Sequence, residues 1–305
     1  MRIIFIGQAP FGGESLENLI AQGEEIVGVI TIPDAPNQRH PNPVKQCAEQ
    51  HAIPLFQSKL LKKPEAISWV RQLKPDLLVL AFVTAFVPQE MIDIAPLGGI
   101  NYHPSLLPKY RGGSAINWAI INGETETGVT IHFIDEGVDT GPILLQEKVS
   151  IEPDDTVKSV YFDKLYPMGI RMISNAVQLI REGKAMPTLQ DESSASFQPV
   201  ITTDDTLIDW SQPTDKVYNL IRGANPAPGA VTSFRGQSCK IFDVKLAAGS
   251  GSAGTILSVD QTSFTVATGN GAIVVQSIQP SKRKKQPAQE FISLNKVREG
   301  DRFGS

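Results

Sequence analysis

Two segments of the chain carry polar side chains whose types and spacing suit group-transfer chemistry. In the first, Asn101 and His103 stand two residues apart at the end of an apolar run, immediately before Pro104. Because alternate residues of a strand share one face, the amide and the imidazole are expected to point the same way. An amide that donates a hydrogen bond to a developing oxyanion and an imidazole that moves a proton can together assist acyl transfer.

The second segment, 135–141, reads Asp-Glu-Gly-Val-Asp-Thr-Gly and joins two apolar runs. Taken alone, Asp139 between glycines is typical of turn chemistry. His132 precedes this segment in an apolar run and is expected to be a structural residue of a strand. Taken alone, His103 would be an ordinary hydrogen-bonded histidine. Its place beside Asn101, before a proline-bounded loop, makes a functional role an equal alternative.

The elements that must position these residues follow an alternating pattern. Apolar runs typical of buried strands lie at 2–7, 24–31, 53–56, 77–82 and 98–103, and helical patterns lie at 13–21, 46–52, 65–73 and 88–94. This alternation predicts an α/β fold with a Rossmann-like, doubly wound, mostly parallel sheet, in which ligands bind beyond the carboxyl ends of the strands.

Three glycines follow the first predicted strand. Gly7, Gly12 and Gly13 do not form the GxGxxG pattern of a dinucleotide site, so a nicotinamide cofactor is not supported. We expect these glycines to form a tight turn between the first strand and the first helix.

The rest of the chain indicates a second domain. A helix is expected at 114–123, paired strands at 128–135 and 142–151, and a long helix at 156–181 that is interrupted near Pro167. Residues 184–205 have linker composition, and short strands separated by glycine and serine follow, as in a small β-barrel. We therefore predict a catalytic domain at 1–183, a linker at 184–205 and a C-terminal β-domain at 206–305.

Composition narrows the classes of partner. Hydrophobic residues make up 41% of the chain, the net charge is −4 and the pI is about 5.7. This balance argues mildly against a protein whose main task is to bind nucleic acid. The basic run Lys282–Lys285 is expected to be solvated surface, and it is the one feature of the sequence that would suit a phosphate-rich partner. Cys47 and Cys239 fit no disulfide or zinc pattern and are expected to be buried thiols. No apolar stretch suits a signal peptide or a membrane span, so the expected location is the cytoplasm.

Several segments together resemble the folate-dependent formyltransferases. They are Asn-Tyr-His-Pro-Ser-Leu-Leu-Pro at 101–108, Arg-Gly at 111–112, Gly-Glu-Thr-Glu-Thr-Gly-Val-Thr at 123–130 and the segment 135–141. Three C-terminal segments, 208–210, 221–223 and 228–230, are also similar to this family. The family includes methionyl-tRNA formyltransferase, sugar and amino-acid N-formyltransferases, and the hydrolase domain of 10-formyltetrahydrofolate dehydrogenase.

The resemblance implies a catalytic set of Asn101, His103 and Asp139, with 10-formyltetrahydrofolate as the formyl donor and no metal. Asn101 and His103 would stabilise the oxyanion, and Asp139 would orient His103 and favour its charged form. It also implies that the C-terminal domain is an OB-like barrel. The residues that would line the folate crevice are Phe82, Thr84, Phe86, Val87, Ser105, Leu106, Leu107, Pro108, Asp135, Gly137 and Val138. Because Asp139 is predicted to lie on a loop, Asp139→Ala should abolish turnover with little loss of stability.

Three local features bear on the acceptor of the formyl group. The loop 33–41 is short and has one arginine. In tRNA-directed members of the family the corresponding loop looks longer and strongly basic. Segments 6–8, 11–12, 102–104 and 114–118 look closest to the hydrolase domain, which passes the formyl group to water. That domain has an aliphatic residue in place of Asn101, so the amide here favours transfer to an amine.

We therefore expect a small-molecule amine ahead of methionyl-tRNA, and initiator tRNA is disfavoured as a partner. Two alternatives stay open. One is hydrolysis of 10-formyltetrahydrofolate, and the other is a folate-binding module without catalysis. No membrane partner is expected.

Overall fold

The structure is a computed structural model that describes residues 1–35 and 40–304 of the 305-residue chain. Residues 36–39, part of the loop on which the acceptor expectation rested, lie outside the described residues. The chain forms two compact units. Unit 1 contains Met1–Gly112, Gly128–Lys148 and Lys164–Phe197, and unit 2 contains Gly113–Thr127, Val149–Asp163 and Gln198–Ser305.

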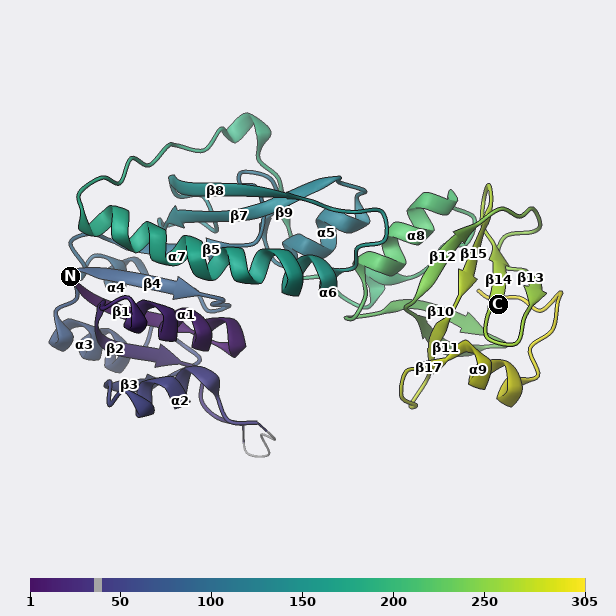
Figure 1. Cartoon of the computed structure of the whole chain (residues 1–305), viewed down its shortest axis with the longest axis horizontal. Helices are drawn as coiled ribbons and strands as arrows, with labels where there is room; N and C mark the ends of the chain where they lie inside the picture. Colours follow the sequence, from purple (N-terminus) through teal and green to yellow (C-terminus); the bar gives the residue numbers. More distant parts are fainter. Residues whose placement is uncertain (36–39, 305) are drawn as a thin grey trace. The chain divides into compact units, whose positions relative to one another are not determined.

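The main sheet has seven strands in the order β3-β2-β1-β4-β5-β7-β8 (Figure 1). The first five in this order are parallel to their neighbours, and β7 runs antiparallel to β5. The predicted Rossmann-like, mostly parallel sheet is confirmed. Its strands are β1 (Arg2–Gly7), β2 (Glu25–Thr31), β3 (Leu55–Gln57), β4 (Leu77–Ala81), β5 (Gly99–His103), β7 (Glu126–Phe133) and β8 (Ile143–Ser150).

Helices cover this sheet, and their apolar sides meet alternate residues of the strands. Ile4, Ile6, Leu78 and Leu80 join one buried cluster with residues of α3 and α4. The helices α1 and α7 pack against each other and lie over the strands on the viewer's side of Figure 1. The helices of this part of the chain are α1 (Ala9–Ala21), α2 (Pro43–Gln50), α3 (Pro64–Leu73), α4 (Gln89–Ile92) and α7 (Tyr166–Arg181).

The glycines after β1 have a different role from the expected turn. Helix α1 begins at Ala9, so Gly12 and Gly13 lie inside its first turns. A Cβ added at Gly13 would come 2.8 Å from Cβ of Pro43, the first residue of α2. Glycine at this position therefore lets α1 and α2 pack closely.

The interruption predicted near Pro167 is present. Residues Val157–Ser159 form α6, Val160–Leu165 form a π-helical segment, and α7 continues to Arg181. Proline has no backbone N–H to donate, so the regular ladder of hydrogen bonds cannot continue through it, and a π-helical turn is a common local adjustment.

Unit 2 contains the predicted small β-domain. Two four-stranded antiparallel sheets, β10-β11-β16-β17 and β12-β15-β14-β13, contribute to one buried cluster that includes Trp210, Phe234, Phe264 and Phe303. Among the described residues no helix is both long and apolar enough to span a bilayer.

The remaining elements complete the chain. They are β6 (Arg111–Gly112), α5 (Ala115–Ile121), 3₁₀ turns at Glu192–Ser194 and Asp204–Thr206, β9 (Phe197–Gln198), α8 (Thr214–Gly223), β10 (Ala230–Phe234), β11 (Gln237–Ile241), β12 (Val244–Ala247), β13 (Ile256–Val259), β14 (Phe264–Ala267), β15 (Ala272–Val275), β16 (Ser277–Pro280), β17 (Gln286–Pro287) and α9 (Ala288–Asn295).

Candidate active site

Strand β5 places Asn101 and His103 on one face of the sheet, at its carboxyl end. Tyr102, between them, turns to the opposite face, where the centroid of its ring lies 4.4 Å from the ring centroid of Phe11 in α1. Asn101 pairs with Leu80 of β4 on one side and with His132 of β7 on the other. The two polar side chains therefore stand where ligands of parallel sheets bind.

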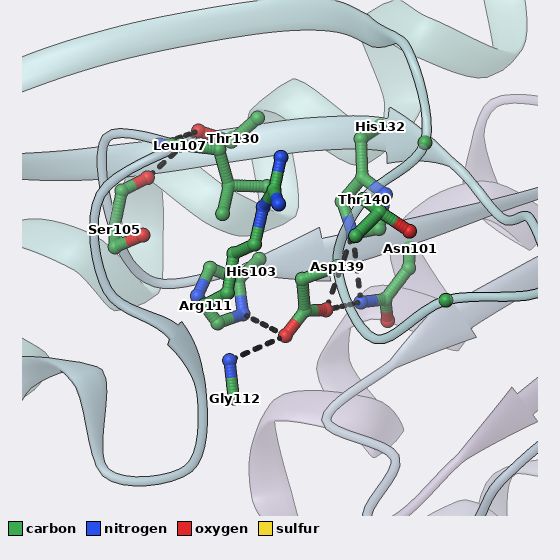
Figure 2. Close-up of polar contacts among 12 residues, drawn as sticks. Asn101, His103, Ser105, Leu107, Arg111, Gly112, Thr130, His132, Asp139 and Thr140 are labelled. Carbon is green, nitrogen blue, oxygen red and sulfur yellow. Dashed lines mark hydrogen bonds and ion pairs between the residues drawn. The ribbon is translucent and has the colours of Figure 1, made fainter. Parts of the chain in front are cut away.

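Asp139 reaches these residues from the turn between β7 and β8. Its backbone adopts a left-handed conformation (φ 55°), which aspartate tolerates better than most residues. One carboxylate oxygen, Oδ2, lies 3.3 Å from Nδ1 of His103 and accepts the N–H of Gly112 at 2.9 Å. The other, Oδ1, accepts the amide of Asn101 at 3.4 Å (Figure 2). The structure thus brings together the three residues predicted from sequence.

His132, expected from the sequence to be a structural residue of a strand, is a fourth member of this cluster. Its Nδ1 lies 2.8 Å from the carbonyl oxygen of Phe133, which can only accept, so Nδ1 carries the proton of the neutral ring. Nε2 is then free to accept the Asn101 amide at 3.2 Å, and it lies 3.4 Å from Oδ1 of Asp139 (Figure 2). Only the antiparallel pairing of β5 with β7 puts His132 opposite Asn101, so the sequence offered no signal for this contact.

The carboxyl group of Asp139 is held in its charged form. Burial by itself raises the pKa of this group. The His132 and His103 rings beside it and the Gly112 N–H together outweigh burial and lower the pKa to about 2. Asp139 is therefore a buried anion at the centre of the cluster at neutral pH.

His103 differs from the sequence expectation, which assigned it a charged ring. Its Nε2 lies 2.7 Å from the carbonyl oxygen of Tyr110, so Nε2 donates and carries a proton. Burial lowers the pKa of His103, while Asp139 and the Tyr110 carbonyl act in the opposite direction. With burial the largest influence, His103 is neutral at pH 7 and its unprotonated Nδ1 faces Asp139.

A second layer of contacts fixes the turn that carries Asp139. The side-chain nitrogen of Gln190 donates to the carbonyl oxygens of Asp139 and Gly141, both at 2.8 Å. The buried Arg111 in turn donates to Oε1 of Gln190 at 2.8 and 3.1 Å and pairs with Glu192 at 2.7 Å. The predicted linker therefore contributes side chains that position the turn, which its composition did not indicate.

Asp135, predicted to contact folate, holds the same turn from within. Its Oδ1 accepts the N–H of Gly137 at 3.1 Å and the hydroxyl of Thr140 at 2.6 Å. The neighbouring Val138 has 48% of its surface exposed.

The 82–88 loop begins next to the cluster, because Leu80 of β4 pairs with Asn101. Phe82 and Phe86 of this loop are 39% and 61% exposed, which is high for phenylalanine and leaves apolar surface available to a ligand. The Thr84 hydroxyl accepts the Gln8 amide at 3.2 Å. Val87, by contrast, is buried in the core beneath α3 and α4, so its side chain faces away from solvent.

The segment 105–108 is fixed by Thr130 of β7. The Thr130 hydroxyl accepts the Leu107 N–H at 3.2 Å and donates to the Ser105 carbonyl at 2.7 Å (Figure 2). The side chains of Ser105 and Leu107 are buried, whereas Leu106 and Pro108 are partly exposed. Of the predicted folate residues in this segment, the last two offer surface to a ligand.

Comparison with known proteins agrees with this fold. The formyl transferase family model matches residues 1–175, and the model of the formyl transferase C-terminal domain matches residues 200–296. The chain belongs to the formyl transferase family. A curated relative, methionyl-tRNA formyltransferase of Geotalea daltonii, is 38% identical over 308 aligned residues that cover 100% of this chain and 98% of the relative.

Two solved structures share the fold. An N-formyltransferase from Helicobacter canadensis, in complex with folinic acid and dTDP-3-aminofucose, matches with a TM-score of 0.71 and 20% identity, covering 91% of this chain and 98% of that one. HypX from Aquifex aeolicus in complex with tetrahydrofolic acid matches with a TM-score of 0.69 and 20% identity over 96% of this chain. The chain spans 47% of the HypX chain.

Proposed function

We propose that this formyltransferase moves the formyl group of 10-formyltetrahydrofolate to the amino group of methionyl-tRNA. The observation that carries the proposal is the full-length similarity, at 38% identity, to a methionyl-tRNA formyltransferase. The convergence of Asn101, His103 and Asp139 at the carboxyl end of β5 supports the chemistry.

In the proposed reaction the acceptor nitrogen attacks the formyl carbon and a tetrahedral oxyanion forms. The two N–H groups of the Asn101 amide are directed at His132 and Asp139, over 3.2 and 3.4 Å. The longer of these bonds is weak, so a substrate oxygen can replace Asp139 as the acceptor. One such donor in an oxyanion hole contributes about 3 kcal/mol to stabilisation of the transition state.

The attacking amine must lose a proton. A carboxylate with a pKa of about 2 is a weak base, so Asp139 by itself is a poor proton acceptor at neutral pH. The unprotonated Nδ1 of neutral His103 is a better one, and once protonated it forms an ion pair with Asp139 across 3.3 Å. The C–N bond to the folate nitrogen then breaks, and that nitrogen takes the proton from His103.

The acceptor in this proposal differs from the small amine favoured by the sequence analysis. That preference relied on the acidic pI and on the loop 33–41. Overall charge is a weak guide to a partner that needs only a local contact surface, and the relative's name supports methionyl-tRNA. A cytoplasmic location belongs to the same proposal, because the acceptor is a component of translation.

The test follows the formyl carbon. The full chain is supplied with 10-formyltetrahydrofolate labelled at that carbon, alone, with a panel of small amines, with uncharged tRNA, and with methionyl-tRNA. We expect label in acid-precipitable tRNA only with methionyl-tRNA. Release of labelled formate at a rate that methionyl-tRNA does not change would establish hydrolysis instead, and label in a small amine would restore the sequence expectation.

A further inference from the structure

Helices α1 and α2 bring together three side chains that the active site does not use. Glu17 lies on α1, Cys47 on α2, and His51 immediately after α2. Cys47 and His51 are four residues apart, so they share one face of the helix. A carboxylate oxygen of Glu17, Oε2, lies 3.2 Å from Sγ of Cys47 and 3.0 Å from Nε2 of His51.

These ligand atoms have nearly the spacing of a tetrahedral metal site. All three lie within 4.8 Å of one another. With zinc bonds of about 2.0–2.3 Å, neighbouring ligand atoms of a tetrahedral site are about 3.3–3.8 Å apart. Two of the three distances between ligand atoms, from Oε2 of Glu17 to Sγ of Cys47 and to Nε2 of His51, are already that short. The third, between Sγ of Cys47 and Nε2 of His51, is at most 4.8 Å, and the His51 side chain is 35% exposed and so has room to move.

We propose that Glu17, Cys47 and His51 bind a zinc-class divalent ion, with water as the fourth ligand. Sulfur, imidazole nitrogen and carboxylate oxygen are the ligand set that Zn²⁺ takes in proteins. Mg²⁺ and Ca²⁺ prefer oxygen ligands and are disfavoured by the thiol. Cys47 is 5% exposed and Glu17 and His51 lie at the surface, so the ion enters from solvent and keeps one open position.

Proton exchange accompanies the binding. Burial, aided by the Glu17 carboxylate, raises the pKa of the Cys47 thiol to about 12, so without metal the thiol is protonated and donates to Glu17. The ion replaces this proton as the partner of both sulfur and carboxylate. Metal ligation deprotonates thiols, so binding releases a proton and strengthens as pH rises.

The proposed ion cross-links α1 to α2, because one ligand comes from α1 and two come from α2 and its end. None of the three ligands belongs to the Asn101 cluster. The metal proposal and the proposed formyl transfer can therefore fail independently. The sequence alone predicts only a buried thiol at Cys47, because Glu17 lies 30 positions away and no zinc spacing is visible.

The experiment titrates the chelator-treated full chain with Zn²⁺ by calorimetry and with Co²⁺ as an absorbing substitute. We expect one equivalent of Co²⁺ to give a thiolate-to-metal charge-transfer band that Zn²⁺ abolishes, and Zn²⁺ to raise the melting temperature. Cys47→Ala removes the band. Cys239→Ala is the matched control, since Cys239 is also a buried thiol and belongs to no such group among the described residues.

His51→Gln and Glu17→Gln change surface residues and keep the test decisive if Cys47→Ala does not fold. Each should weaken Zn²⁺ binding at least as much as loss of an outer-shell partner, about 10–100-fold. Absence of the charge-transfer band with the wild-type chain would overturn the proposal. So would a band that persists in Cys47→Ala, or equal Zn²⁺ affinity in wild type, His51→Gln and Glu17→Gln.

Discussion

Replacing Asp139 with asparagine tests how the cluster works, because the new side chain has the same shape and no charge. In the proposed mechanism the carboxylate stabilises the His103 imidazolium that forms during the reaction. A charge-assisted hydrogen bond of this kind contributes about 1.5–3 kcal/mol. With each 1.4 kcal/mol worth a tenfold change in rate, Asp139→Asn should lower turnover about 10- to 150-fold.

The same substitution should also change stability, contrary to the expectation that a loop residue can be replaced at little cost. Asp139 is 12% exposed, and its pKa lies at about 2 instead of 3.8. This shift corresponds to stabilisation of the folded state by about 2 kcal/mol. Because the folded-state pKa is the lower one, the stabilisation is present above about pH 4 and is lost as pH falls toward 2. Asparagine cannot provide it at any pH.

Two measurements check the Asp139 prediction. Absorbance follows tetrahydrofolate release at pH 7, and urea unfolding compares the variant with wild type at pH 7 and pH 3. Glu136→Gln serves as the control, since Glu136 is an exposed acid of the same turn. A turnover within twofold of wild type would refute the role given to the carboxylate. A stability difference that does not shrink at pH 3 would refute the lowered pKa.

Three further predictions concern the surroundings of this carboxylate. His132→Ala removes the acceptor that orients the Asn101 amide. We expect kcat to fall roughly tenfold, which corresponds to about 1.4 kcal/mol less stabilisation of the transition state. A double-mutant cycle with Asn101→Ala should be non-additive, and additive effects would contradict the contact. Gln190→Ala frees the carbonyls of Asp139 and Gly141 and should lower kcat several-fold while KM for the folate stays within about twofold, as steady-state kinetics can show. In the pH profile of kcat/KM, the acid limb set by His103 should lie below pH 6.5, because burial lowers its pKa and the neutral ring is the active form. Asp139→Asn should move that limb to still lower pH, and a limb above pH 6.5 would contradict a neutral ring.

Much of the fold was predictable because its signals are local. The apolar runs that became β1, β4 and β5 are buried along their lengths, and a buried parallel strand needs continuous apolar sequence. The boundary of α1 was wrong by four residues. Glycine usually indicates a turn, and the packing of Gly13 against Pro43 depends on a helix that is distant in sequence.

The candidate site likewise contains residues that local sequence signals predicted and residues that they could not. Alternation along one strand was enough to place Asn101 and His103 on a common face, and the family resemblance supplied Asp139. His132 and Gln190 were missed, because their contacts arise from strand pairing and from the path of the 184–197 segment.

The sequence by itself determined the order of strands and helices, the family, and the residue types at the carboxyl end of β5, since each depends on neighbours along the chain. Only the tertiary structure decided which side chains carry protons and which side chains lie next to one another. Burial makes His103 neutral although a carboxylate stands 3.3 Å away, and helix packing places Cys47 beside Glu17 and His51. Desolvation and proximity in space are properties of the folded chain, so no reading of adjacent residues can supply them.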